Sequence, residues 1–534
     1  MAEKKNSFLK GALILTVAGF VVKLLGAVYR IPLALMIKDE GMGLYQMAYP
    51  IYATLLSIST SGLPTAISKM VAEDVAIGRY KNAYRTFRVS VAVLASVGLV
   101  LTLALITTAE VLSVKVLGNP KAVYPILSIA PAIFFVSIMS SFRGFFQGLQ
   151  DMTPSAVSQV AEQLGRVVAV FVLATWLLPR GVEYAAAGAA FGPVVGALAG
   201  LGILLVIYAK KKNEILINMY KDPAKTLENP FHIIYRLFAF AIPITLGGLI
   251  IPAMNLADAA IVNRRLQYAG FTVKKATELY GQLTGMAAPL INLPAIVTIA
   301  LSASLVPAIS EAVALRDMRL AALRAETGVR ISIIFGLPAA AGMFVLSTPI
   351  SVLLYKNPDA GIPLAVLSWG VIFLSLNQTT TGILQGVGKT LIPVRNLMMG
   401  AFAKVAINYA LTGIPSVNIK GAALGTVVGY MIASLLNFGA VIRYTGLVID
   451  INHLILKPAV ATTLMGIGVY FTYDKLVNMG FGRNMVTLAA VASGAVIYVV
   501  FLVLIGGVRR GDLEMLPGGR RVIAVLSKFG AFRR

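Results

Sequence analysis

Residues 11–37 read GALILTVAGFVVKLLGAVYRIPLALMI, an apolar run that is interrupted only by Lys23 and Arg30. Roughly 20 apolar residues at about 1.5 Å each cross the hydrocarbon core of a bilayer, so this run predicts a transmembrane helix. The spacing of the two cations is close to two helical turns, which places both on one face, roughly 10 Å apart. A cation in hydrocarbon costs about 2.5–3.5 kcal/mol, and we therefore expect this face to line a watery cavity.

Each of these cations also has a structural interpretation. Arg30 precedes the end of the run by only a few residues, so its side chain could extend to the membrane interface. Lys23 is too central for that, but an acidic residue on another helix could neutralise it. No acidic residue lies within one turn of either cation, which favours the cavity for Lys23.

Similar apolar segments follow one another through the chain, in which 58% of the 534 residues are hydrophobic. They predict an all-α polytopic membrane protein with about 14 transmembrane helices. Residues 44–70 and 390–413 are two of these spans. The formal charge of +24 comes from cations spread over short loops, so we expect no nucleic-acid partner. The chain has no cysteine and therefore no disulfide or thiol chemistry.

The loops on the same side as the N-terminus carry most of the 46 Lys and Arg residues. The positive-inside rule then places both termini in the cytoplasm of a bacterium, in a multi-pass protein of the plasma membrane. One loop on the outer side departs from this trend. It follows the seventh predicted helix and begins with Arg264.

Two pairs of segments reveal an internal repeat. RGFFQGLQDMTP at 143–154 matches TGILQGVGKTLIP at 381–393, with Gly144 and Gly382 238 positions apart. GAAFGPVVG at 188–196 matches GAALGTVVG at 421–429, and a weaker similarity pairs 63–68 with 306–310. Six helices separate the copies, so the repeat predicts two parallel, pseudo-symmetric six-helix lobes and two extra helices at the C-terminal end.

The repeat also predicts the domain organisation. The expected parts are an N-lobe at 1–209, a cytoplasmic linker at 210–233, a C-lobe at 234–443, helices 13 and 14 at 444–506, and a basic cytoplasmic tail at 507–534. Glycines recur every four residues in the second pair of segments, which include Gly192 and Gly425. This spacing is typical of helices that pack closely in lipid.

Polar residues inside the predicted spans are the candidate functional residues. Glu162 and Arg166 are spaced i, i+4, so they can form a structural ion pair as readily as contact a ligand. Asp258, one turn after Asn255, is either a coupling site or the partner of Lys23 or Lys404. The predicted substrate-binding set is Lys23, Arg30, Arg166, Lys404 and Arg264. The predicted coupling or ion-pair set is Asp258, Glu162 and Asn255.

Catalysis has little support in the sequence. His232 and His453 lie in or beside predicted loops, so they suggest neither a metal site nor a catalytic triad. The GVGKT segment at 386–390 lacks the first glycine of a phosphate-binding loop, because that position is Ile383. We therefore expect a transporter without cofactors rather than an enzyme, with coupling to membrane potential or a monovalent ion left open.

Several motifs carry a resemblance to a known family. They are KLLGAVYRIP, GLYQMAYPIY, LPTAISKMVAE, NLADAAIVNRRL and the repeated pair around Gly144 and Gly382. The chain resembles the stage V sporulation protein B group of the multidrug/oligosaccharidyl-lipid/polysaccharide (MOP) superfamily. This group belongs to the polysaccharide-exporter branch and is similar to the MurJ-type lipid II flippases of peptidoglycan synthesis. The resemblance covers essentially the whole chain.

The resemblance implies two lobes around a cationic cavity that opens alternately to each side of the membrane. It implies a lipid-linked saccharide pyrophosphate as cargo, first of all lipid II, with the polyprenyl tail in a groove of the last two helices. MurJ-type flippases have functional arginines in their first helix, and Lys23 and Arg30 are similar to these. One cation is displaced by a residue, because Tyr29 stands at that position. The arginines of their second and eighth helices have no clear counterpart here.

The implied roles are cell-wall biogenesis, cell shape and sporulation, with membrane lipids and cell-wall synthesis proteins as partners of a monomer. Two alternatives stay open. One is a flippase for another polyprenyl-linked saccharide, and the other is a cation-coupled multidrug antiporter of the same superfamily.

Overall fold

The structure is a computed structural model in which residues 14–15, 17–22, 24–220, 222, 227–448 and 450–507 are described. Lys23 and most of the predicted basic tail, residues 508–534, lie outside these residues. Helices are the only regular elements in the described ranges, and they group into two compact units. The predicted all-α class is therefore confirmed.

Unit 1 contains the described parts of residues 1–264 together with residues 271–281. Its first helical segment starts before Tyr29 and continues into α2. The α-helices after it are α2 (Arg30–Thr60), α3 (Leu63–Ala76), α4 (Tyr80–Val111), α5 (Val123–Ile129), α6 (Pro131–Gly148), α7 (Thr153–Leu177), α8 (Val182–Tyr220), most of α9 (Pro230–Tyr268) and α10 (Val273–Gly281). Short π or 3-10 turns, η1 (Leu112–Val116), η2 (Pro120–Ala122) and η3 (Leu178–Arg180), join some of them.

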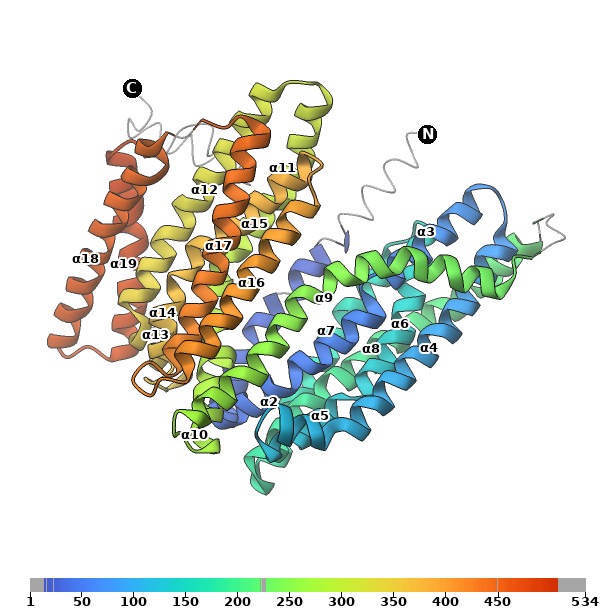
Figure 1. Ribbon diagram of the computed structural model, residues 1–534, viewed down its shortest axis with the longest axis horizontal. Helices are drawn as coiled ribbons and strands as arrows, with labels where there is room; N and C mark the ends of the chain where they lie inside the picture. Colours follow the sequence, from blue (N-terminus) through green and yellow to red (C-terminus); the bar gives the residue numbers. More distant parts are fainter. Residues whose placement is uncertain are drawn as a thin grey trace. The chain divides into compact units, whose positions relative to one another are not determined.

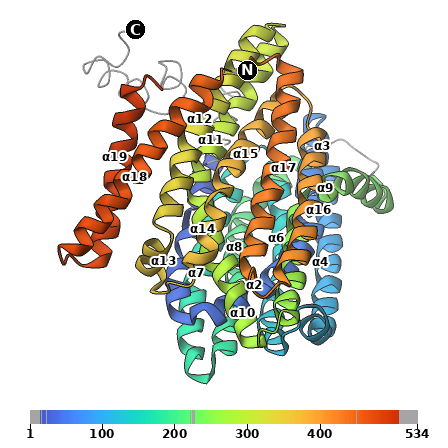
Figure 2. The same ribbon diagram turned by 60° about the vertical axis from the view of Figure 1, so that its left-hand side comes forward.

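Unit 2 contains residues 265–270 and the described residues from 282 onward. Its elements are η4 (Gln282–Ala287), α11 (Ala288–Ala314), α12 (Met318–Val345), α13 (Ser347–Tyr355), α14 (Gly361–Ser368), α15 (Gly370–Gly386), α16 (Leu391–Thr412), α17 (Ile419–Thr445), η5 (Asn452–Leu456), α18 (Lys457–Asn478) and α19 (Arg483–Leu504). The last two helices lie side by side at one edge of this unit, next to α12 (Figures 1 and 2).

The division between the units differs from the predicted lobe boundary at residue 234. Residues of α9 as far as Arg264 belong to unit 1. Ile233, Leu237 and Ala241 of this helix are buried in the same apolar core as Phe87 and Phe142. The apolar face at the start of α9 is thus covered by helices of the first repeat.

The number of transmembrane helices remains a prediction. In the described residues 11 helices are long and apolar enough to cross a membrane, or 12 if α14 and α15, which meet at 46°, form one span. Two predicted spans run together in the segment Val17–Ala76, which Lys38 interrupts with a φ of 56°. A third predicted span, 390–413, corresponds to α16, whose apolar character is reduced by Lys404 and Asn408.

The two units repeat the same local backbone with an offset of 238. Helix α3 ends at Ala76 and α11 at Ala314, and the turns that follow contain positive φ angles at Gly78 and Arg316. A second pair of turns has positive φ at Gln150 and Gly388, after α6 and α15. Chain reversals of equal length therefore place equivalent helices in equivalent positions within each unit.

Contacts between helices correct one part of the predicted repeat. A Cβ atom at Gly144 would lie 2.7 Å from the Pro64 carbonyl oxygen, and one at Gly382 would lie 2.9 Å from the Ser302 carbonyl oxygen. Pro64 thus corresponds to Ser302, again 238 positions away, and not to the proline of residues 306–310. The predicted match of 63–68 with 306–310 is wrong because it aligned similar residues that lie at different positions along α3 and α11.

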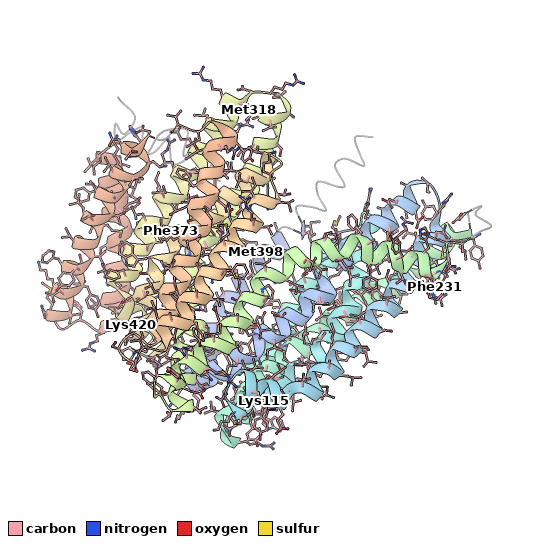
Figure 3. The ribbon with its side chains drawn as sticks, viewed as in Figure 1. Lys115, Phe231, Met318, Phe373, Met398 and Lys420 are labelled. Carbon is pink, nitrogen blue, oxygen red and sulfur yellow. The ribbon has the colours of Figure 1, made fainter. Side chains whose placement is uncertain are left out.

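Loops of opposite predicted orientation lie at opposite ends of each unit. In unit 1 the ends are marked by Phe231 and Lys115, and in unit 2 by Met318 and Lys420 (Figure 3). The sequence predicts the regions around Phe231 and Met318 to be cytoplasmic and the other two to be external. Each unit therefore has the two ends that a membrane-spanning bundle requires.

Candidate functional site

An ionic triad links α6 to α7 inside unit 1. Glu162 Oε1 lies 2.9 Å from Arg166 Nη2, and Glu162 Oε2 lies 3.0 Å from Arg143 Nη2. The Arg143 Nε–H also donates to Ser158 Oγ at 2.8 Å. All three charged side chains are 14–16% exposed, so water screens them weakly. One carboxylate is thus shared by two guanidinium groups.

Arg143 is in neither the predicted substrate-binding set nor the predicted ion-pair set. The structure places it inside α6, which continues to Gly148. Arg143 directly precedes Gly144 in the repeated RGFFQG segment. Because Gly144 and Gly148 both pack closely against α3, this segment indicated that Arg143 lies within a packed helix. By contrast, the pair of Glu162 and Arg166 has the geometry that its i, i+4 spacing predicts.

Arg30 begins α2 among tyrosine side chains. Its guanidinium carbon is 6.0 Å from the centre of the Tyr49 ring, at the outer limit of a cation–π contact. Beside it, the hydroxyl groups of Tyr29 and Tyr45 are 3.1 Å apart, and both tyrosines are buried. Tyr29 and Tyr49 lie near Arg166 as well, so the two arginines share neighbours.

Four polar atoms near this cluster are buried and have no hydrogen-bond partner in the described part of the chain. They are Arg30 Nε, Arg166 Nε, Gln163 Nε2 and the Tyr52 hydroxyl oxygen. All four groups carry hydrogens to donate. A buried donor without an acceptor costs about 1–3 kcal/mol. This cluster, which we call the arginine–tyrosine cluster, is therefore suited to a ligand that supplies acceptor oxygens and negative charge. It consists of Arg30, Arg166, Tyr29, Tyr45, Tyr49, Tyr52 and Gln163, whose Nε2 lies 3.6 Å from a Cβ built on Gly26, one turn before Arg30.

Lys404 lies in unit 2 on α16, facing the glycines of α17. The lysine is 7% exposed, and its Cβ lies 3.1 Å from where a Cβ of Gly429 would be. Asn408 is one turn further along and faces Gly425. Hydrogen-bonded asparagine side chains connect this helix to α17 and α15. Asn396 donates to Asn437 at 2.9 Å, and Asn437 donates to Asn377 at 3.0 Å.

The other predicted residues are in different surroundings. Arg264 donates to the backbone carbonyl of Val116 at 2.9 Å and to that of Lys115, and so satisfies carbonyls at the end of η1. This contact gives Arg264 a structural role, while substrate binding by it stays a prediction. On α9, Asp258 is half-buried and Asn255 is exposed, and their proposed roles in coupling or ion pairing stay predictions as well.

An apolar cleft of about 540 Å³ lies among α12, α13, α18 and α19 of unit 2. Its walls include Phe335, Met343, Met465 and Val499. The one tyrosine in the wall, Tyr498, donates its hydroxyl hydrogen to the Ile334 carbonyl at 2.7 Å. The polar atom is thereby satisfied, and the cleft presents hydrocarbon to whatever enters it.

Known proteins with similar sequences cover nearly the whole chain. Residues 8–313 match the family described as polysaccharide biosynthesis protein, and residues 284–410 match the MatE family. Stage V sporulation protein B of Bacillus subtilis is 31% identical over 96% of this chain and 98% of its own length. Lipid II flippase MurJ of Bacillus subtilis is 29% identical, over 96% of this chain and 97% of its own length.

Solved structures show the same fold. Lipid II flippase MurJ in an inward closed conformation aligns with a TM-score of 0.67 and 14% identity, over 92% of this chain and 98% of that one. An inward-facing multidrug resistance MATE family transporter of the MOP superfamily aligns with a TM-score of 0.63 over 82% and 98%. The fold is thus that of polytopic helical transporters. The chain belongs to the polysaccharide biosynthesis protein family of the MOP superfamily, in the group of stage V sporulation protein B and the MurJ-type flippases.

Proposed function

We propose that this multi-pass membrane transporter is a flippase for a lipid-linked saccharide pyrophosphate, first of all lipid II. It moves the head group from the inner to the outer leaflet of the cytoplasmic membrane by alternating access. The single observation that carries the proposal is the arginine–tyrosine cluster of unit 1, in which buried N–H and O–H groups have no hydrogen-bond acceptor among the described residues.

A pyrophosphate head group provides what this cluster needs. Its oxygens accept several hydrogen bonds at once, and its negative charge matches Arg30 and Arg166. Charge-assisted hydrogen bonds of this kind contribute about 1.5–3 kcal/mol each. Hydroxyl groups of Tyr49 and Tyr52 offer further contacts to sugar or phosphate oxygens.

The polyprenyl tail needs a separate place, because it gains nothing by leaving an apolar environment. The cleft among α12, α13, α18 and α19 is almost entirely apolar and suits such a chain. Unit 1 thus offers a site for a charged head group, and unit 2 offers an apolar site for a hydrocarbon chain. The names of two relatives, a lipid II flippase and a sporulation protein, support a cargo from cell-wall synthesis.

A multidrug antiporter for organic cations fits this site less well. Such a cargo requires an embedded carboxylate, but each oxygen of Glu162 already accepts from an arginine. The charge of the surrounding cluster also repels a cation. Energy input from the membrane potential or from a monovalent ion completes the proposal, with Asp258 as the candidate coupling residue.

Reconstitution tests this function directly. The full-length protein in vesicles should translocate fluorescent lipid II but not a fluorescent anionic phospholipid. Arg166→Gln should lower the rate roughly 10- to 100-fold, because one charge-assisted contact is lost. Arg319→Gln is the matched control, since Arg319 is an exposed arginine on α12. Equal translocation of both lipids, or a parent protein no faster than empty vesicles, would contradict the proposal.

A further inference from the structure

A cavity of about 290 Å³ lies among the ends of α3, α4, α6 and α8 in unit 1 (Figure 1). Hydrogen bonds show that this is the end of the unit where Phe231 lies. The Lys81 backbone N–H donates to Asp222 Oδ2 at 2.8 Å, and the Glu228 backbone N–H donates to Asn82 Oδ1 at 3.1 Å. These bonds join the start of α4 to the segment before α9, which the sequence predicts to be cytoplasmic. The cavity is near the lower size limit of sites for small organic molecules.

Unit 2 fills the corresponding space with its own chain. Helix α17, the counterpart of α8 in the repeat, ends earlier than α8 does. The chain turns at Gly446, with a φ of 71°, and Leu447 enters the apolar core, where it is 4% exposed. Leu447 shares that core with Ile383, which corresponds to Phe145 of the cavity wall at the offset of 238. Because α8 continues as a helix, unit 1 has no such side chain to fill the space.

Several polar groups of the cavity wall already have partners. Lys211, the one basic side chain among the described residues that line the cavity, forms an ion pair with Asp151. The hydroxyl groups of Tyr84 and Tyr208 lie 2.7 Å apart and bond each other. These pairs connect α8 to α4 and to the end of α6, and they leave little charge for a ligand to neutralise.

Glu214 is the exception among the charged groups of the wall. It follows Lys211 by three residues on α8, so both side chains face the cavity. Its carboxylate forms no hydrogen bond or ion pair within the described part of the chain. The lining therefore carries one uncompensated negative charge. Aromatic rings lie around it and attract cations to their faces, and they belong to Tyr80, Tyr84, Phe145 and Phe146.

We infer that this cavity binds a small organic cation, a protonated amine on a compact apolar body. The ammonium group pairs with Glu214, and the apolar body lies against Phe145 and Phe146, which are buried. An anion of the same size would meet two carboxylates, those of Glu214 and Asp151, and is excluded by repulsion.

The inference goes beyond the proposed function and does not rest on it. No member of the arginine–tyrosine cluster lines this cavity. The site lies beside Lys211 at the end of unit 1, so its cation is a bound ligand and not a cargo. Since the walls come from four helices, a bound amine holds the end of α8 against α3, α4 and α6, and it stabilises the folded state.

Three probes of similar size and different charge test the class of ligand. They are phenethylamine, which is a cation at neutral pH, phenethyl alcohol, which is neutral, and phenylacetate, which is an anion. Titration calorimetry and thermal unfolding of the full-length protein in detergent measure binding. The variants are Glu214→Gln, which removes the charge, and Ala83→Leu, which fills the cavity from α4. Glu110→Gln is the matched control, because Glu110 is an exposed carboxylate at the other end of α4.

We expect phenethylamine to bind with saturation and to raise the unfolding temperature, and the other two probes to bind more weakly. Glu214→Gln should weaken the binding of phenethylamine about fivefold but leave that of phenethyl alcohol unchanged, because only the ion pair is lost. Glu110→Gln should behave as the parent does. Ala83→Leu should bind none of the probes, since its side chain occupies the space.

Two results would overturn the inference. One is an affinity for phenethylamine that is equal in the parent and in Glu214→Gln. The other is a parent that binds phenylacetate as tightly as phenethylamine. Both comparisons use variants of an exposed residue or the parent itself, so they hold even if Ala83→Leu does not fold. The measurements need neither lipid II nor vesicles, so failure here leaves the proposed function standing, and failure of lipid II translocation leaves this site standing.

Discussion

At the scale of single residues, the tyrosines of the arginine–tyrosine cluster differ in how their hydroxyl groups are satisfied. Tyr29 and Tyr45 bond each other at 3.1 Å. Tyr52, which is 1% exposed, has no partner for its hydroxyl oxygen among the described residues. An unpaired buried hydroxyl reduces stability, so a ligand or a water that reaches Tyr52 would recover that cost.

Replacing Tyr52 by Phe should therefore separate stability from function. We expect the free energy of unfolding to rise by about 1 kcal/mol, because an unsatisfied polar atom is removed from the interior. Lipid II translocation should fall at the same time, because a contact to the head group is lost. Thermal unfolding and vesicle transport measure the two effects. Tyr498→Phe is the matched control and should lose stability instead, since that hydroxyl has a partner at 2.7 Å.

Lys23 lies outside the described residues, so its role stays a prediction from the sequence. Lys23→Ala should leave expression nearly unchanged but lower transport sharply, because a shielded charge-assisted contact is removed. Lys23→Arg should retain part of the activity, and Lys23→Glu none. Translocation by Lys23→Glu at the parent rate would refute a cationic site. Recovery of stability and transport in Lys23→Ala by a second change, Asp258→Ala, would identify the two as an ion pair instead.

At the scale of helices, glycines on one face determine which pairs touch. Gly192 on α8 faces Val170 and the backbone of Arg166 on α7, and Gly425 on α17 faces Asn408 on α16. Small residues at such positions let backbones approach, which is how helices associate in lipid. These seams also carry Arg166 and Lys404, so close packing fixes where the cations point.

Leucine at Gly192 or Gly425 should reduce the amount of folded protein, because the added side chain would occupy space filled by the facing helix. The same helices supply matched controls. Gly202 on α8 and Gly439 on α17 have no atom within 4 Å of a built Cβ, so Gly202→Leu and Gly439→Leu should be tolerated. Yield and thermal unfolding of the four variants would show whether the seams are needed for folding. Equal behaviour of all four would assign these glycines another purpose.

At the scale of the whole molecule, helix length constrains the topology. Helix α8 has 39 residues. Its length of roughly 58 Å exceeds the hydrocarbon thickness of about 30 Å, so one end must project from the membrane. That end carries Lys210, Lys211 and Lys212, which the positive-inside rule places in the cytoplasm.

Single cysteines in this cysteine-free chain test that topology. A cysteine at Asn213, exposed on α8, should not react with an impermeant thiol reagent added to intact cells. A cysteine at Asp359, in an exposed turn between α13 and α14, should react under the same conditions. Labelling of Asn213→Cys from outside would contradict the predicted orientation of the chain in the membrane.

The amino-acid sequence by itself determined the all-helical class, the internal repeat, and the ion pair of Glu162 with Arg166. Each of these follows from local hydropathy, from identical short segments, or from spacing along one helix. Tertiary structure decided the partnership of Arg143 with Glu162, the correspondence of Pro64 with Ser302 in the repeat, and the placement of α9 in unit 1. These features depend on contacts between helices far apart in the chain, and the hydrophobic period of one helix contains no information on which neighbour its polar atoms meet.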